Sequence, residues 1–309
     1  MPPENPQVPT LRQTLVSSLT RLYPFYSGCA RFGNNPFVQK LAGATNETVW
    51  ARVSGGKILA PLGDFVGRAA YYVGDYDRQI TWICSRLIRP GDTVLDIGAN
   101  IGVVTVWMAK LVGDSGRVHA FEPNPMLVQL LGRVIERNQL TNVRLHPVAL
   151  GQETGELELR VPRCNNAGLG SLTRYHDSPD CDAVPVSVKQ LSAVAAQEAI
   201  QSVRLIKIDV EGYEVEVFRG AHSFLQTARP EAIIFELNER TDGADWESPL
   251  IKLLLEHDYA ILAIPRAFMR MRLQIVDPRG GRPLVGHDFL AVARGENYND
   301  ILTRVNGTQ

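Results

Sequence analysis

The sequence predicts an α/β domain built on an open, mostly parallel β-sheet, with a smaller extension at its N-terminus. From about residue 78 onward, short β-branched apolar runs alternate with amphipathic helical patterns. Strands and helices in this order require parallel strands joined by right-handed crossovers. The first of these strands also ends in a glycine turn that leads directly into a helix, which is typical of the ligand-binding edge of such a sheet.

The composition excludes several classes of function. Lys and Arg total 32 against 33 Asp and Glu, a net charge of -1, so no overall positive field favours nucleic acid as a partner. The four cysteines form no CxxC pair and the six histidines no HxH or HxxxH pair, which favours a reducing compartment and argues against structural zinc. No apolar run is long enough for an integral membrane segment, so we expect a cytoplasmic protein.

Residues 1–75 are expected to form the N-terminal extension. The first ten residues contain four prolines and are predicted to be disordered. Residues 11–23 carry one apolar helical stripe, made by Leu11, Leu15, Leu19 and Leu22. We expect this stripe to pack on the protein's own body or on a second subunit, which makes a homodimer possible. A membrane-surface role is less favoured, because Arg12 and Arg21 alone supply a basic face.

The remaining elements follow in order along the chain. Residues 48–73 contain short apolar runs broken at Gly55-Gly56, which predicts a small β-hairpin. The main domain is expected over 76–295 and a tail over 296–309. Its helices are expected over residues 79–88, 103–111, 126–138, 214–226 and 248–257. Its strands are expected over residues 93–98, 117–122, 143–150, 204–210, 231–237, 259–264 and 288–294.

Residues 151–188 interrupt this rhythm. Two strand patterns, at 155–162 and 184–188, flank a long polar loop. An insertion of this kind over the sheet is where a substrate-specific cover is expected.

The stretch "VLDIGANIGVVT" at residues 94–105 contains the first candidate site. Gly98 and Gly102 allow a tight turn and a close approach of the backbone to a ligand. Glu122, twenty residues past Gly102 in "FEPNP", closes the second strand at the position where an acid accepts hydrogen bonds from ribose hydroxyls. The glycine turn and Glu122 together predict a cofactor that contains adenosine.

Two cofactors compete for this site. A dinucleotide fold requires GxGxxG, and here the middle glycine is absent. S-adenosylmethionine has no phosphate, and Asp96 and Asn100 are well placed for its amino and carboxylate ends. We therefore favour S-adenosylmethionine over a nicotinamide cofactor and a dehydrogenase. The alternative for Asp96 is that it only caps a turn while the glycines serve packing.

Four blocks in order, "VLDIGANIGVVT", "FEPNP", "IKIDVEGYEVEVFRGA" and "IIFELN", resemble the FkbM family of S-adenosylmethionine-dependent methyltransferases. The resemblance covers about residues 66–238. It implies the Rossmann-like class I methyltransferase sheet of seven strands with the last strand antiparallel, and methylation of hydroxyl groups on sugars or polyketide-type products. Tyr76-Asp77 stands where the family has Tyr-Glu, and Leu191-Ser192 where it has Leu-Asp. The second departure puts a role for that carboxylate in doubt.

Further contacts are expected around the cofactor. The resemblance implies that Ala149, after the third strand, lines the adenine. Pro123 adjoins the ribose-binding acid, and Asp77 is expected to close the pocket from the N-terminal side. Ser171 and Leu172 match a family loop that lies over the active site.

The stretch "IKIDVEG" is the candidate source of catalytic groups. On an extended strand Lys207, Asp209 and Glu211 share one face. A hydroxyl nucleophile must lose its proton, so Asp209 and Glu211 are expected to act as base or to orient the acceptor, with Lys207 keeping one carboxylate ionised. The alternative is that Asp209 caps the helix beginning near Gly212-Tyr213, with Lys207 as its buried partner.

Glu236, which closes the next strand, is the other inward carboxylate. It is expected either to contact the substrate or to hold the loop after it. Asp209, Glu236 and Asn238 together would resemble a Mg²⁺ site of the catechol type, but we expect no metal.

The sequence therefore predicts a methyltransferase that uses S-adenosylmethionine to methylate a hydroxyl of a saccharide, glycolipid or secondary metabolite. The alternatives are an N-methyltransferase acting on a small amine or a peptide, and a binding protein that keeps the cofactor pocket without catalysis. The expected partner is a small-molecule or glycan substrate.

Overall fold

The central feature of the fold is one twisted, mostly parallel sheet. The computed structural model describes residues 6–43, 45–163, 167–173, 179–237, 246–267, 269–276 and 286–306. Among these residues the sheet has eight strands, in the spatial order β12 (Gln274–Val276), β11 (Tyr259–Ala263), β13 (Asp288–Ala293), β10 (Ala232–Glu236), β9 (Leu205–Ile208), β3 (Thr93–Ile97), β4 (Arg117–Phe121) and β5 (Val143–His146).

The strand directions confirm the predicted class of fold. Strands β5, β4, β3, β9 and β10 run parallel, and β13 is antiparallel to both its neighbours, β10 and β11. The last long strand in the chain is thus inserted antiparallel, as predicted. One difference is the short β12, which pairs antiparallel with β11 and adds an eighth strand at the sheet edge.

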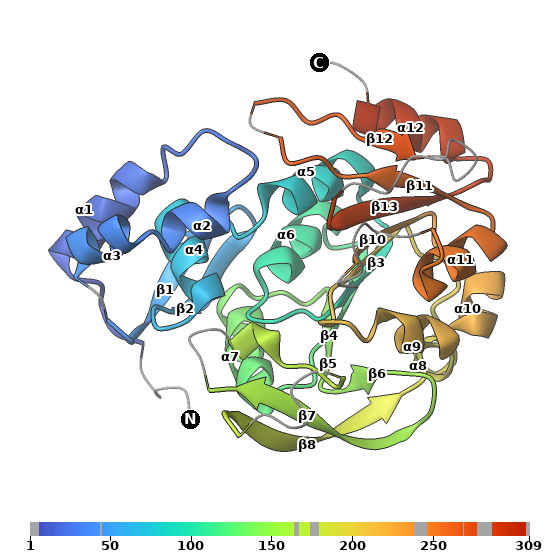
Figure 1. The fold of residues 1–309 in the computed structure, drawn as a ribbon, viewed down its shortest axis with the longest axis horizontal. Coiled ribbons are helices and arrows are strands. Elements are labelled where there is room, and N and C mark those ends of the chain that lie inside the picture. The colour runs from blue at the N-terminus through green and yellow to red at the C-terminus, as the bar shows by residue number, and fades with distance from the viewer. Residues whose placement is uncertain are drawn as a thin grey trace.

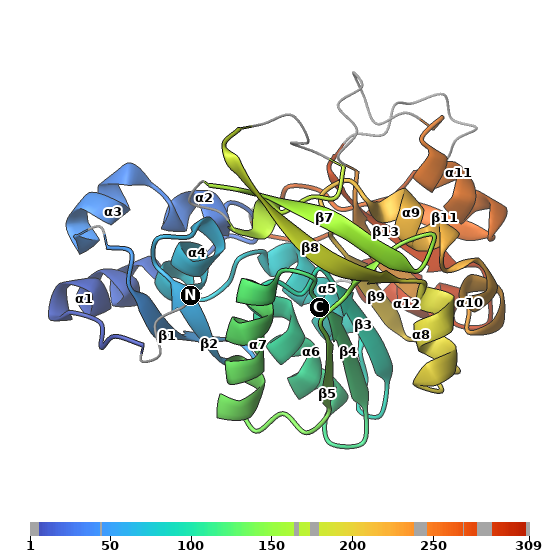
Figure 2. The same cartoon turned by 90° about the horizontal axis from the view of Figure 1, so that it is seen from below.

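Helices cover both faces of this sheet (Figures 1 and 2). One face carries α5 (Arg78–Leu87), α6 (Val103–Val112), α7 (Pro125–Arg137) and α12 (Tyr298–Asn306). The other carries α8 (Leu191–Gln197), α9 (Glu214–Arg219), α10 (His222–Thr227) and α11 (Pro249–Glu256). Because both faces are covered, β9 and β11 are buried along their whole lengths, which explains the continuous apolar run of β11 and the apolar residues on both sides of Lys207 in β9.

Several predicted elements are divided in the structure. The strand expected over 143–150 splits into β5 and β6 (Ala149–Leu150), because Pro147 has no N–H for a ladder. The helix expected over 214–226 breaks into α9 and α10 at Gly220, where the chain packs closely on another segment: a Cβ here would lie 1.9 Å from the Gly151 carbonyl oxygen.

The insertion after the third parallel strand forms a small sheet of its own (Figure 2). Strands β7 (Gly155–Pro162) and β8 (Cys181–Lys189) pair antiparallel, and β6 pairs parallel with β8. The two strands predicted in the insertion are thus present. A short 3-10 helix, η1 (Ala167–Leu169), lies in the connection between β7 and β8.

The N-terminal extension contains the predicted hairpin, β1 (Thr48–Val53) and β2 (Gly56–Pro61), in which Val53 pairs with Gly56. It also contains helices that the sequence did not predict: α2 (Cys29–Gly33), α3 (Pro36–Ala42) and α4 (Phe65–Val73). The expectation of disorder over the first ten residues is wrong for residues 6–10, since the Gln7 amide donates to the Thr48 carbonyl at 2.8 Å; residues 1–5 lie outside the described residues.

Helix α1 (Leu11–Thr20) confirms the predicted helix. Its buried side, however, is opposite to the one expected from the leucine pattern. The leucine stripe does not pack on the protein's own body: Leu11, Leu15, Leu19 and Leu22 are 58–77% exposed. Instead Gln13, Ser17 and Thr20 are buried against the protein. The physical reason is that this polar face bonds to the last turn of α4, whose carbonyl groups have no partners within that helix.

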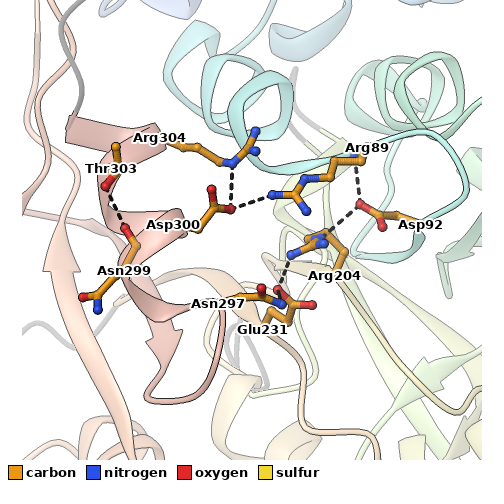
Figure 3. Close-up of polar contacts among 9 residues, drawn as sticks. All are labelled: Arg89, Asp92, Arg204, Glu231, Asn297, Asn299, Asp300, Thr303 and Arg304. Atoms are coloured by element: carbon orange, nitrogen blue, oxygen red, sulfur yellow. Dashed lines mark hydrogen bonds and ion pairs between the residues drawn. The ribbon is translucent and has the colours of Figure 1, made fainter.

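The C-terminal segment expected as a tail is a docked helix. Figure 3 shows that Asp300 of α12 accepts from Arg89 and Arg304, at 2.6 and 2.8 Å. In the same network Arg204 bridges Asp92 and Glu231. The ion pair between Asp300 and Arg89 holds α12 beside the end of α5. The predicted domain boundaries, at residues 75/76 and 295/296, stay predictions. No helix among the described residues is long and apolar enough to span a bilayer.

Candidate active site

A cavity of about 500 Å³ opens at the carboxyl ends of β3, β4, β9 and β10. This is the edge at which ligands bind in open parallel sheets. The insertion contributes to its lining through Leu159, Gly170 and Leu172, and α4 contributes Val66. Leu172 thus lies over the cavity, as expected of its loop, whereas Ser171 is fully buried and its hydroxyl donates to the Glu211 carbonyl at 2.9 Å.

The glycine turn forms part of the cavity wall. Gly98 has φ +77°, and a Cβ on it would lie 1.9 Å from the Asp209 carbonyl oxygen, so this position requires glycine. Asn100 has φ +52°, and its side-chain oxygen accepts from the Ile101 amide at 2.7 Å. Gly98 and Asn100 both line the cavity, which agrees with their predicted place beside the cofactor.

Glu122 is 5% exposed and lines the cavity next to Pro123. Its carboxylate accepts the Asn100 amide at 2.8 Å and the Asn124 amide at 2.9 Å. The acid thus ties the glycine turn to the end of β4. Two oxygens have about four acceptor positions, so capacity remains for two ribose hydroxyls. Burial raises the pKa of Glu122 to about 7.

Two residues expected at the cofactor do not line the cavity. Asp96 is fully buried beneath it, where its Oδ2 accepts from the Thr105 hydroxyl at 2.6 Å. Burial raises the pKa of Asp96. Gly102 has φ +88° and starts α6, and a Cβ there would meet Leu131 at 2.6 Å. Asp96 and Gly102 therefore support the turn from behind.

Lys207 connects the buried and the open parts of the site. Its Nζ donates to the Gly98 carbonyl at 2.9 Å and lies 3.7 Å from Asp96 and 3.6 Å from Asp209. Burial alone lowers the pKa of Lys207, but Asp209 and Asp96 outweigh it and the net pKa is raised. The ammonium group is therefore a fixed positive charge in the wall of the cavity.

The turn after β9 differs from the extended strand that the sequence predicts. Strand β9 ends at Ile208, and Glu211, at φ +54°, lies in a turn. Lys207, Asp209 and Glu211 nevertheless all line the cavity. Asp209 does not cap α9, because that helix has no side-chain cap, so the capping alternative is wrong.

Glu214 holds this turn and was missed by the sequence analysis. Its Oε1 accepts the amides of Val210 and Gly212 at 3.2 and 3.3 Å. The residue is 4% exposed, and burial raises its pKa. The sequence signal for this role is an acid two residues after the glycine of "VEGYE", where its carboxylate can accept amides of the preceding turn.

A second group of acids lines the cavity beyond Lys207. Asp288, which the sequence analysis placed only in a strand, lies directly across from Glu236 in the β10–β13 ladder. Burial, reinforced by Asp77 and Asp209, raises the pKa of Asp288 to about 7. Asp77 lines the cavity as expected and also caps α5, accepting the Gln79 amide at 2.9 Å. Burial raises the pKa of Asp77 to about 6.

Tyr76 stands among these acids. Burial raises the pKa of its phenol, and Asp209 and Asp77 add to the effect. Arg266 and His287 complete the lining on this side. Among the described residues, the lining contains more acidic side chains than basic ones, the basic ones being Lys207 and Arg266. This excess of negative charge suits a positively charged ligand.

The described residues contain one group that could hold a metal ion, and it is elsewhere. It consists of His119, His146 and Glu198, none of which lines the cavity. Asn238, the third member of the Mg²⁺ site considered from the sequence, lies outside the described residues.

Residues 96–261, more than half of the chain, match the family described as the methyltransferase FkbM domain. The chain belongs to the FkbM methyltransferase family. It is therefore an enzyme whose cofactor is S-adenosylmethionine, which confirms the resemblance seen in the four sequence blocks.

Individual methyltransferases show the extent of the similarity. The 31-O-demethyl-FK506 methyltransferase FkbM of Streptomyces tacrolimicus is 29% identical over 202 residues, which cover 57% of this chain and 75% of that protein. The hexuronic acid methyltransferase AglP of Haloferax volcanii is 26% identical over 167 residues, 53% of this chain and 62% of that protein. A solved structure, methyltransferase FkbM from Methylobacillus flagellatus, aligns with a TM-score of 0.40 at 15% identity, over 91% of this chain and 59% of that one.

The site fits this cofactor on physical grounds. S-adenosylmethionine carries a sulfonium and an ammonium group and no phosphate, and acids predominate in the lining. The aromatic ring of Phe121 and the apolar residues Val148, Ala149 and Leu150 offer a surface for adenine on the side of Glu122. When bound, the cofactor supplies an electrophilic methyl group. In the chain itself, Glu122 has acceptor capacity for the ribose hydroxyls, and Asp209 and Asp288 place carboxylates in the same cavity.

Proposed function

We propose that this FkbM methyltransferase methylates a hydroxyl group of a saccharide, glycolipid or secondary metabolite, with Asp209 as the base. The observation that carries this proposal is the position of Asp209 at the cavity floor, 3.6 Å from the Lys207 ammonium. A hydroxyl has to lose its proton as it attacks, so a carboxylate in the cavity has a direct use. The ion pair with Lys207 holds that carboxylate in position.

The names of two relatives support an oxygen acceptor on a complex product and a sugar substrate. One relative is named for the 31-O position of FK506, and another for a hexuronic acid. In this chain Glu211, Glu236 and Asp288 line the same cavity as Asp209, and we propose that they help to orient the acceptor. Positioning of the nucleophile in line with the methyl group can then supply most of the acceleration.

The test separates binding from chemistry in one variant. We expect Asp209→Asn to lower kcat by about 100-fold, the usual contribution of a general base, while the dissociation constant of S-adenosylmethionine changes less than threefold. The assay is transfer of a labelled methyl group to a panel of monosaccharides, glycolipids and macrolides. Asp258→Asn, an exposed ion-paired acid far from the cavity lining, is the matched control and should match the parent.

Other outcomes distinguish the alternatives. Retention of full kcat by Asp209→Asn on an amine or a peptide would indicate N-methylation, because a neutral amine needs less help from a base. Tight binding of S-adenosylmethionine without transfer to any acceptor would indicate a binding protein.

We also propose that the protein acts in the cytoplasm. Cys29, Cys84 and Cys181 are free and buried. Burial raises the pKa of the Cys29 thiol to about 11, so this thiol is unreactive at neutral pH. Free thiols are compatible with a reducing compartment.

A further inference from the structure

Helices α1 and α3 present a continuous apolar face to solvent, which we call the leucine face. Its members are Val8, Leu11, Leu15, Leu19, Leu22, Phe37 and Leu41. Leu11, Leu19 and Leu22 are 77%, 70% and 75% exposed, and Phe37 is 67% exposed. Figures 1 and 2 both show α1 and α3 side by side at the end of the molecule remote from the large sheet.

The fold holds this face outward by specific bonds. The Ser17 and Thr20 hydroxyls donate to the Tyr71 and Tyr72 carbonyls of α4, at 2.8 and 2.5 Å. Arg21 also donates to the Tyr71 carbonyl, at 2.8 Å. The polar side of α1 is therefore committed to the protein body. Rotating the leucines inward would leave these α4 carbonyls without partners, which is costly for buried polar groups.

The leucine face is larger than chance exposure explains. The largest apolar patch of a typical soluble monomer is about 300–600 Å² and is often functional. Here seven large apolar side chains are exposed by 45–87% on α1, on α3 and on the residues next to α1. The face therefore needs a partner that covers it.

The charges around the leucine face indicate which partner. Residues 5–46 contain four basic residues, Arg12, Arg21, Arg31 and Lys40, and no Asp or Glu, within a chain whose net charge is -1. Arg12, Arg31 and Lys40 are exposed. Two copies of the chain meeting at this face would bring two such basic segments together, which like-charge repulsion disfavours. A surface of anionic lipid headgroups instead complements them, while its acyl region receives the leucines.

We propose that the leucine face docks the enzyme onto an anionic lipid surface, with α1 lying in the interfacial plane. The helix is already folded and capped by Thr10 and Gln13, so binding does not have to order it. Arg12 ties α3 to α1 by donating to the Lys40 carbonyl at 2.7 Å, and Phe37 and Leu41 of α3 are exposed beside it. The inference is independent of the proposed acceptor.

The test is co-sedimentation of the full-length protein with vesicles. We expect binding to vesicles of phosphatidylcholine with 30% phosphatidylglycerol, and at least tenfold weaker binding to phosphatidylcholine alone. Salt at 0.5 M should also weaken binding, because it screens the attraction between headgroups and basic residues. The double variant Leu15→Glu/Leu19→Glu should lose binding at least tenfold, because two charged groups replace two membrane-buried side chains.

Two further variants separate the contributions. Leu157→Glu, at a 42% exposed leucine on β7 of the insertion, is the matched control and should bind as the parent does. Arg31→Gln/Lys40→Gln should lower binding to the anionic vesicles severalfold without affecting the apolar contact. Unchanged melting temperature and S-adenosylmethionine affinity in each variant show that the fold is kept.

Two results would overturn the proposal. One is an absence of vesicle binding by the parent at low salt. The other is a stable dimer in light scattering that Leu15→Glu/Leu19→Glu dissociates, which would assign the leucine face to a second copy. Neither result bears on methyl transfer, so the proposed activity is tested separately.

Discussion

Replacing Glu122 by glutamine tests the ribose-binding assignment at the level of single atoms. Each carboxylate oxygen accepts one backbone amide, from Asn100 at 2.8 Å and from Asn124 at 2.9 Å. Glutamine keeps one acceptor and turns an NH₂ donor toward the other amide, which costs about 1–3 kcal/mol for the unpaired donor. It also removes one hydrogen bond between a ribose hydroxyl and a charged acceptor, about 1.5–3 kcal/mol. We expect S-adenosylmethionine to bind about 100-fold more weakly, which corresponds to about 2.7 kcal/mol.

The assay is isothermal titration calorimetry with S-adenosylmethionine at pH 8, above the raised pKa of Glu122 near 7. Glu236→Gln, another cavity acid in a different strand, is the control and should stay within threefold of the parent. If Glu122→Gln, folded to the same extent, binds within threefold of the parent, the ribose assignment is refuted.

The pH dependence supplies a second readout of Glu122. Burial raises the pKa of Glu122 in the folded state from its ordinary value of 4.5 to about 7. Between these two values the folded state binds more protons than the unfolded state, so the free energy of unfolding falls as pH rises. The cofactor needs the ionised acceptor, so its affinity should fall as pH drops from 8 to 6, by at most about tenfold per pH unit. Glu122→Gln should lose this dependence, whereas Asp288→Asn, which removes another group titrating near 7, should retain it.

The remaining predictions concern the support of the site. Lys207→Met leaves the buried Asp96 carboxylate without its cation, and we expect a loss of about 3–5 kcal/mol of unfolding free energy in urea titration. Adding Asp96→Asn should recover part of that loss, and a cost below 1 kcal/mol for Lys207→Met alone would contradict the buried ion pair. Gly98→Ala places a methyl group 1.9 Å from the Asp209 carbonyl at φ +77°, so it should lower the melting temperature and abolish measurable cofactor binding. Gly155→Ala, where a Cβ meets nothing within 4 Å, is the control, and equal effects of the two variants would argue against the close approach at Gly98.

Local patterns were sufficient to predict the cofactor half of the site. Gly98, Asn100 and Glu122 lie at the ends of two strands that are neighbours in the sheet, with one helix between them. The short crossover makes their proximity a consequence of sequence interval alone. The position of Asp209 at the same sheet edge was also predictable, because Asp209 directly follows β9, and β9 pairs with β3.

The acceptor half was only partly predictable. Asp288 is far from Glu236 in the chain, and the antiparallel insertion of β13 beside β10 brings the two together. No local pattern marks Asp288, which is why the sequence analysis saw a strand there and no site residue. For Asp96 the sequence predicted a ligand contact that the structure does not show. Its side chain is buried under the turn, where it contacts Thr105 and Lys207.

The sequence alone determined the class of sheet, the cofactor and the acid that is expected to hold the ribose, because these depend on periodicity and on short intervals along the chain. The tertiary structure decided which side of α1 is buried. The 4-4-3 spacing of its leucines predicts a helix, but the unpaired carbonyls at the end of α4 recruit Ser17 and Thr20, and this turns the leucines outward. Hydrogen bonds between segments distant in sequence, which periodicity does not contain, therefore decide which surfaces this methyltransferase presents.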